Sequence, residues 1–227
     1  AFRSGTYGGE IYGEYGSLGA TVAAILLHPE ARSSSHQSKT TGLLREPMLK
    51  LIHFMRSMEY SDDHGEMIAF KRLVDVIGQF PYQSPTVFNF FDAEYMPSRF
   101  AASESEPESE PEPPHVAPEF QIFTPPWAIG LLNGMWTIMQ YGISNCETGL
   151  GIGDLISSSC KRGTLGFSPS SEEEALHELD LLLTGGRLTT LDAAVVKHAY
   201  DNPPEGGSQL HAAQKAILLT PEFHNLG

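Results

Sequence analysis

The amino-acid sequence predicts an all-α protein, a mainly α-helical and irregular multi-helix bundle with long loops. Two observations lead to this prediction. Apolar residues recur at helical spacing in several segments, and capping residues, glycines or prolines stand where these segments begin and end. In addition, 41% of the 227 residues are hydrophobic, which is enough to bury a core as one large domain or as two small ones.

Two helices are expected near the N-terminus. For the first, Ser17 is a suitable N-cap and Pro29 a suitable end. Its apolar positions are Leu18, Val22, Ile25 and Leu26. The second helix follows Gly42, and Glu46 and Pro47 suit its first turn. Its apolar stripe, which we expect to be buried, consists of Met48, Leu51, Ile52, Met55 and Met58.

The middle of the chain is expected to be irregular. Residues 69–77 favour a short helix that Gly78 ends. Residues 80–100 are rich in aromatic side chains, but three prolines exclude a long helix there. Residues 101–115 form an acidic Ser/Glu/Pro linker that has no side chain able to build a core, so we predict an extended or disordered insertion.

Three helices are expected toward the C-terminus, after a buried helix over residues 127–141 and a glycine-rich loop over residues 146–166. The first has a capping box of Ser171 and Glu174 and is stopped by Gly185. The second is capped by Thr189, and its predicted stripe is Leu191, Ala194, Val195 and Ala199. The third covers residues 210–219 and is stopped by Pro221.

These elements suggest three parts. Residues 1–100 form an N-terminal helical part with the aromatic segment, 101–115 form the linker, and 116–227 form a C-terminal helical part. We expect the two helical parts to pack together as one domain, because a surface insertion between them costs little loop entropy.

The two cysteines, Cys146 and Cys160, flank the glycines of the predicted loop. A disulfide between them would contribute on the order of 3 kcal/mol by the loop-entropy estimate, and the alternative is two unpaired thiols. The sequence has no second cysteine pair and no closely spaced histidine pair, so we expect no metal site.

Charge and motif content exclude several functions. With 14 basic and 28 acidic residues the net charge is −14, which disfavours binding to nucleic acid or to an anionic membrane surface. Residues 120–146 lack charge throughout and are long enough to span a bilayer. Their prolines and amides nevertheless favour a helix buried in protein over a membrane span. No nucleophile elbow, phosphate loop or dinucleotide fingerprint is present, and we expect no cofactor.

Four phrases of the sequence resemble the C-terminal half of the family known as domain of unknown function 1800. They are residues 24–32 (AILLHPEAR), 42–47 (GLLREP), 84–91 (SPTVFNFF) and 118–122 (PEFQI). The resemblance implies a mostly helical protein that is secreted, periplasmic or at the cell surface, with a sulfatase-like companion as a partner and no established activity. It also implies that family members are longer, so an N-terminal half of the same protein is a second candidate partner.

Four residues near these phrases are candidates for catalysis. Arg45 is suited to bind a carboxylate, phosphate or sulfate, and Glu46 stands at the positive end of a helix dipole. Asp92 and Glu119 would supply a general acid and base if the fold brought them together. For each of them the alternative is a structural role in a salt bridge, a backbone contact or a solvated surface.

Four further residues are candidates for ligand binding. Asn89 lies among phenylalanines and would brace a loop or face a ligand. Tyr82, Tyr95 and Trp127 offer apolar ring faces that match the C–H faces of sugars, and core packing is the alternative.

The sequence therefore leaves three hypotheses. The first is a non-catalytic helical module of an exported protein that binds polysaccharide at the cell surface. The second is a hydrolase or lyase that acts on sulfated or uronic polysaccharide through Arg45, Asp92 or Glu119. The third is a structural interaction module that a missing N-terminal half completes.

Overall fold

The computed structural model describes residues 1–29, 32, 43–62, 70, 73–98, 116–144, 150 and 161–226. Within them the chain divides into two compact units, Ala1–Leu43 and Leu44–Leu226. The predicted linker 101–115 and both cysteines lie outside the described residues.

The first unit combines one helix with a small hairpin. Strands β1 (Thr6–Tyr7) and β2 (Glu10–Ile11) pair antiparallel, and α1 (Leu18–Leu26) contacts β1. The Ser17 hydroxyl accepts a hydrogen bond from the Ala20 N–H at 3.1 Å, so the predicted N-cap is confirmed. Within this unit α1 buries Ala20 and Ala23. Its large apolar residues remain 52–72% exposed there; they are Leu18, Val22, Ile25 and Leu26.

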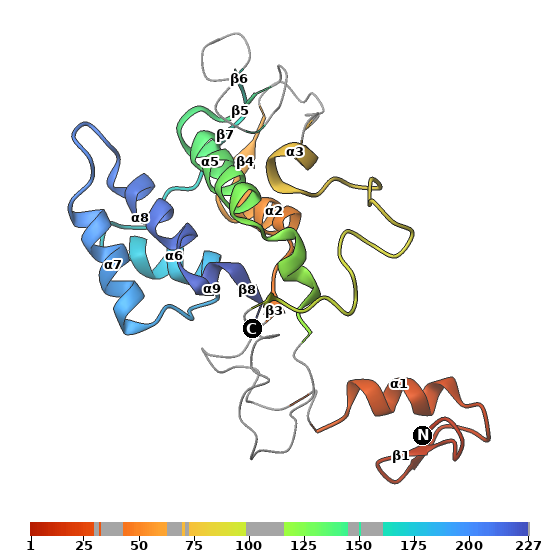
Figure 1. Ribbon diagram of the computed structural model, residues 1–227. Helices are drawn as coiled ribbons and strands as arrows, with labels where there is room; N and C mark the ends of the chain where they lie inside the picture. Colours follow the sequence, from red (N-terminus) through yellow and green to blue (C-terminus); the bar gives the residue numbers. More distant parts are fainter. Residues whose placement is uncertain are drawn as a thin grey trace, which may run out of the picture. The chain divides into compact units, whose positions relative to one another are not determined.

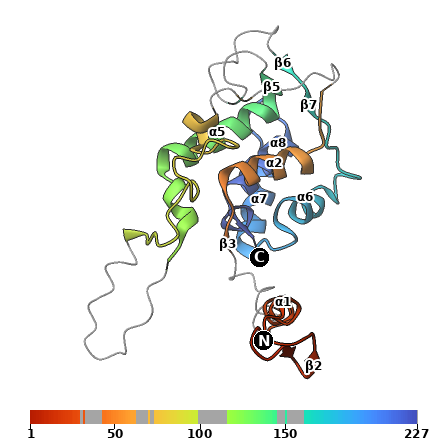
Figure 2. The same ribbon diagram turned by 90° about the vertical axis from the view of Figure 1, so that its right-hand side faces the viewer.

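The second unit is organised around α5 (Pro125–Tyr141), the longest helix in Figure 1. Helix α2 (Pro47–Ser57) packs beside it, as Figure 2 shows, and α3 (Leu73–Ile77) packs against its first half. One apolar core joins α2 and α5 to the C-terminal helices. Its largest fully buried apolar side chains are Phe54, Phe223, Leu51, Met58, Ile77, Leu131, Met135, Ile138, Ile143, Leu150 and Leu179.

Three longer helices and one short helix complete this unit. They are α6 (Ala175–Thr184), α7 (Thr190–Asp201), α8 (Gln209–Leu218) and α9 (Pro221–His224). The Thr189 hydroxyl accepts from the Asp192 N–H at 3.1 Å, which confirms its predicted role as the cap of α7. The Ser171 hydroxyl accepts from the Glu174 N–H at 3.2 Å, but α6 begins only after Glu174. Helix α8 ends at Leu218, shortly before the predicted stop at Pro221, and Pro221 is the first residue of α9.

The predicted stripe of α7 is wrong. Leu191 and Val195 are 74% and 53% exposed, whereas Val196 is the buried residue of the helix. The helix has two apolar rows, and its extensive packing against α8 selects the row that contains Val196.

The fold is mainly helical, but the prediction of an all-α protein is too strict. Strand β4 (Tyr60–Ser61) pairs with β7 (Thr164–Leu165), and β5 (Ile143–Ser144) pairs with β6 (Lys161–Arg162). A third pair joins β3 (Leu43–Leu44) to β8 (Asn225–Leu226). Strands of two residues are too short to show an alternating pattern, so no feature of the sequence predicts them.

The aromatic segment is irregular, as predicted. Residues 80–97 form turns and bends, and after the undescribed linker the chain continues as a 3-10 helix, η2 (Pro118–Ile122). The Asp92 N–H donates to the Gln121 side-chain oxygen at 2.6 Å, so the chain on the two sides of the linker meets in the same unit.

Glycine allows α3 to approach α5 closely. A Cβ at Gly130 of α5 would overlap the carbonyl oxygen of Val76 in α3. Because a backbone atom cannot yield as a side-chain tip does, the helices would have to move apart to accept any larger residue.

We therefore predict that Gly130→Ala lowers the free energy of unfolding by about 1–3 kcal/mol. Urea unfolding followed by tryptophan fluorescence measures this, since Trp127 and Trp136 both lie on α5. The matched control is Ile129→Ala, because Ile129 is the adjacent residue and is 58% exposed. The control should change stability by less than about 0.5 kcal/mol, and equal effects of the two substitutions would contradict the proposed close contact.

Candidate functional site

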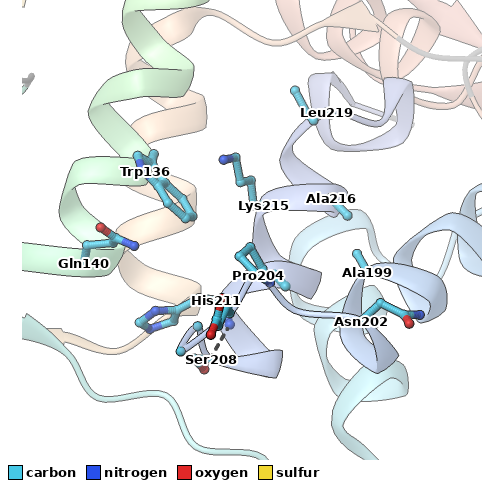
Figure 3. A pocket seen from close by; sticks show the side chains of 14 residues that line it. Trp136, Gln140, Ala199, Asn202, Pro204, Ser208, His211, Lys215, Ala216 and Leu219 are labelled. Carbon is cyan, nitrogen blue, oxygen red and sulfur yellow. Dashed lines mark hydrogen bonds between the residues drawn. The ribbon is translucent and has the colours of Figure 1, made fainter.

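A cavity of about 440 Å³ lies between α5, α8 and the loop that joins α7 to α8 (Figure 3). Trp136 and Gln140 face it from α5, where they are one helical turn apart. His211 and Lys215 face it from α8 with the same spacing. The connecting loop forms the remaining wall; its lining residues include Asn202, Pro204, Glu205, Gly206, Gly207 and Ser208.

The side chains of Trp136 and Lys215 meet inside this cavity. The Lys215 ammonium lies 3.8 Å from the centre of the Trp136 ring, a cation–π contact that is visible in Figure 3. Burial lowers the pKa of His211 below its usual value, so its ring is neutral at neutral pH. The cavity thus combines an aromatic wall, a neutral imidazole, two side-chain amides and one ionised group of each sign, Lys215 and Glu205.

A second group of polar side chains is buried where α2 meets the C-terminal residues. Lys50 is fully buried, and its Nζ has no hydrogen-bond partner. This atom lies 3.7 Å from the centre of the Phe123 ring, and the His224 ring packs against the same phenylalanine at 5.3 Å between centroids. Burial, with a smaller contribution from the charge of Arg45, lowers the pKa of Lys50 to about 7.

His224 and Arg45 are in the same surroundings. Burial and the nearby Lys50 charge lower the pKa of His224 to about 4, and its Nδ1 has no hydrogen-bond partner. Arg45 is 6% exposed, donates to the carbonyl of Phe223 and stacks 5.0 Å from that residue's ring centre. Among the described residues, no carboxylate forms an ion pair with Lys50 or Arg45.

The structure does not join the four predicted catalytic residues into one centre. Arg45 is fixed by Phe223, and Glu46 accepts a hydrogen bond from the Gln79 side chain at the start of α2. Asp92 accepts from the Glu94 N–H at 3.1 Å, and Glu119 lies in the first turn of η2. Within the described part of the chain, no hydrogen bond or ion pair links any two of these four.

The predicted ligand-binding residues are also separate from one another. Asn89 and Asp92 line a second cavity of about 440 Å³, together with Phe88 and Gln121. Within it the Asn89 side-chain oxygen accepts from the Phe90 N–H at 2.8 Å, the loop-bracing contact that the sequence offered as one alternative. Tyr82 is fully exposed, and Trp127 covers Gly78. The Tyr95 carbonyl accepts from the Ala117 N–H at 2.8 Å.

Sequence reasoning missed the residues of the cavity beside α5. The sequence places Trp136 in the buried helix over residues 127–141 and predicts no role for His211 or Lys215. The available signal was the spacing of His211 and Lys215, which places both on one face of a helix. Nothing in the sequence indicated that this face would be opposite Trp136.

Two other features are absent from the described residues, a metal-binding cluster and a membrane-spanning helix. No group of three or more histidine, cysteine, aspartate or glutamate side chains is placed to hold a metal ion there. Within the same residues, no helix has the length and apolar content to cross a membrane.

Comparison with known proteins gives one match. The sequence model of a family described as "Protein of unknown function (DUF1800)" matches residues 8–225, which is nearly the whole chain. No curated protein and no solved structure matches the chain.

The buried Lys50 generates a prediction about stability. Replacement by methionine keeps the apolar stem and removes an amine without a partner, so Lys50→Met should raise the free energy of unfolding at pH 7 by about 1–3 kcal/mol. The substitution should also change the pH dependence. Because the pKa falls from 10.5 in the unfolded chain to about 7 in the folded one, the unfolded state binds more protons between these values. The free energy of unfolding should therefore rise with pH across this window, and Lys50→Met should reduce the rise.

Urea unfolding between pH 6.5 and 9.5, a range chosen to cross the window from about 7 upward, measures both effects. The control is Lys197→Met, because the Lys197 side chain is 64% exposed on α7 and should leave the slope unchanged. A slope that is the same in the wild type and in Lys50→Met would show that Lys50 is not buried in the way described.

Proposed function

This chain belongs to the DUF1800 family of proteins of unknown function, and from that premise we propose that it is a binding module for a neutral polysaccharide at the cell surface. The proposed site is the cavity beside α5. The observation that supports it most directly is the position of Trp136, a half-buried aromatic wall in a cavity whose polar lining is mostly neutral, with Lys215 and Glu205 as its two charged residues.

The lining chemistry suits a polyhydroxylated ligand. An indole face provides the flat apolar surface that the C–H face of a sugar ring requires, and the flexible Lys215 side chain that lies over the Trp136 ring would have to move aside for stacking. Around it, the amide of Gln140 supplies both donors and an acceptor, and so does the hydroxyl of Ser208. The Asn202 amide nitrogen already donates to the His198 carbonyl at 3.0 Å, so its oxygen is the group left for a ligand. Hydroxyl groups also act as donor and acceptor, so such a set can satisfy several of them at once.

The size and openness of the cavity suit part of a polymer. Its volume of about 440 Å³ is within the usual range for small-molecule sites. The cavity is open rather than enclosed, so a chain could continue beyond it.

Charge favours a neutral polysaccharide over a uronic or sulfated one. The cavity has Lys215 but also Glu205, and the protein as a whole has a net charge of −14. A polyanion would be repelled at long range and would gain little net attraction on arrival. The cell-surface setting follows from the family resemblance described above and is a proposal of the same kind.

A hydrolase or lyase has less support. It needs an acid and a base in one cleft, and no contact in the described residues brings Arg45, Asp92 and Glu119 together. A binding role requires only the cavity.

We predict that Trp136→Ala weakens binding to a neutral polysaccharide by at least about tenfold, because stacking on one aromatic residue contributes roughly 1–2 kcal/mol. The measurement is affinity electrophoresis against a panel of neutral glucans, mannans and xylans, followed by calorimetry with oligosaccharides of the best polymer. Oligogalacturonate serves as the acidic comparison.

Two further variants make the test specific. Gln140→Ala removes an exposed amide and should weaken binding without affecting folding, even if Trp136→Ala destabilises the core. Tyr82→Ala removes a fully exposed aromatic outside the cavity and should change nothing. Loss of binding in Tyr82→Ala alone, preference for oligogalacturonate, or no binding to any polymer would each contradict the proposal.

A further inference from the structure

One solvent-exposed face of α2 has an unusual mixture of side chains. Leu49, Ile52, His53 and Arg56 are spaced so that they share one side of the helix, opposite the buried Leu51 and Phe54. Leu49 and Ile52 are 45% and 43% exposed. With Leu182 of α6 they border an open groove of about 560 Å³, here named the α2 groove; it is lined by Arg45, Leu49, Ile52, His53, Arg56, Ser57 and Leu182.

The α2 groove contains a fixed cation with unused hydrogen-bonding capacity. The cation is Arg45, whose exposed fraction is only 6%. Its guanidinium is held by the carbonyl and the ring of Phe223, yet its Nε has no hydrogen-bond partner. This Nε atom is enclosed by its neighbours, so what Arg45 contributes to the groove that it lines is its positive charge.

The groove is basic although the protein is acidic. Two arginines line it, and no aspartate or glutamate does. Burial and the charge of Arg45 lower the pKa of His53, so this histidine adds no charge at neutral pH. In the described residues neither arginine has an ion-paired carboxylate. An anion in the groove would therefore meet two cations and no carboxylate among the lining residues.

The apolar rim indicates what kind of anion fits. Inorganic phosphate or sulfate would leave Leu49, Ile52 and Leu182 in water, and an acidic polysaccharide has no aliphatic groups to cover them. A protein segment with both carboxylates and aliphatic side chains would pair with the arginines and bury the rim at once.

We propose that the α2 groove is a docking site for an acidic, aliphatic segment of a partner protein. This site is separate from the cavity beside α5 and shares no lining residue with it. The carboxylates bind the exposed Arg56 at the rim and are attracted by the charge of Arg45 at the floor. The aliphatic side chains cover Leu49, Ile52 and Leu182.

The test uses a fluorescein-labelled peptide with a Leu-Leu-Glu-Glu repeat and the complete chain. Two matched peptides separate the contributions: a Leu-Leu-Gln-Gln repeat lacks charge, and a Ser-Ser-Glu-Glu repeat lacks aliphatic groups. Anisotropy is measured at about 0.15 M salt, where the Debye length is roughly 8 Å. At that ionic strength distant acidic residues are screened, while contacts within the groove are not.

We expect the Leu-Leu-Glu-Glu peptide to bind at least about tenfold more tightly than either matched peptide. Arg56→Glu should remove this preference, and Leu49→Asn should weaken binding through the rim. Both residues are exposed, so neither change should unfold the protein. Lys197→Glu makes the same charge change on exposed α7 and should have little effect.

Three results would overturn the proposal. They are equal binding of the three peptides, equal effects of Arg56→Glu and Lys197→Glu, and competition by inorganic phosphate or oligogalacturonate as strong as by unlabelled peptide. Trp136→Ala should leave peptide binding intact, which keeps this test independent of the proposed polysaccharide site.

Discussion

The second unit depends on how closely its neighbours can approach α5. This helix is contacted by α2, α3, α8 and the short strands, so most of its surface is packed, while Ile129, Asn133 and Gln140 stay exposed. A helix in this position cannot have a large side chain on every face. Gly130 admits the backbone of α3, and Gly134 admits the side chain of Leu150. On the side of α8, Trp136 lines the candidate cavity and contacts Lys215. The candidate site thus shares α5 with the core.

The junction between α2 and the C-terminal residues follows a different rule. Its polar side chains are held by backbone carbonyls and aromatic rings. Arg187 donates to the carbonyls of Glu222 and Asn225, at 3.0 and 2.7 Å, and Arg45 donates to that of Phe223. These contacts hold the last residues of the chain in place but do not neutralise the cations. Burying charged groups together is unfavourable, and it lowers the pKa values of Lys50 and His224. Both groups can therefore lose their charge more easily than they would in water.

The sequence allowed most helices to be predicted but not the faces that they bury. Caps and stops are local, so Ser17, Thr189 and Gly185 could be interpreted without knowing the rest of the chain. Burial is set by distant neighbours. Ile52 was placed in the buried stripe of α2 and is exposed, whereas Phe54 was omitted and is fully buried. The candidate cavity was missed for the same reason, because Trp136 and Lys215 become neighbours only when α5 and α8 pack together.

Net charge predicts the behaviour of the whole molecule at a distance, but it does not predict the chemistry of one surface. At −14 the chain repels polyanions, and this repulsion extends over the Debye length. Within contact distance the local groups decide. The cavity beside α5 has one ionised side chain of each sign, and the α2 groove has two arginines without an acid. A protein can therefore reject a long anionic polymer and still bind a short acidic segment, because the segment brings few charges into the repulsive field and pairs them at contact. Long-range repulsion and short-range pairing thus act over different distances, so the two proposed sites are compatible with one acidic molecule.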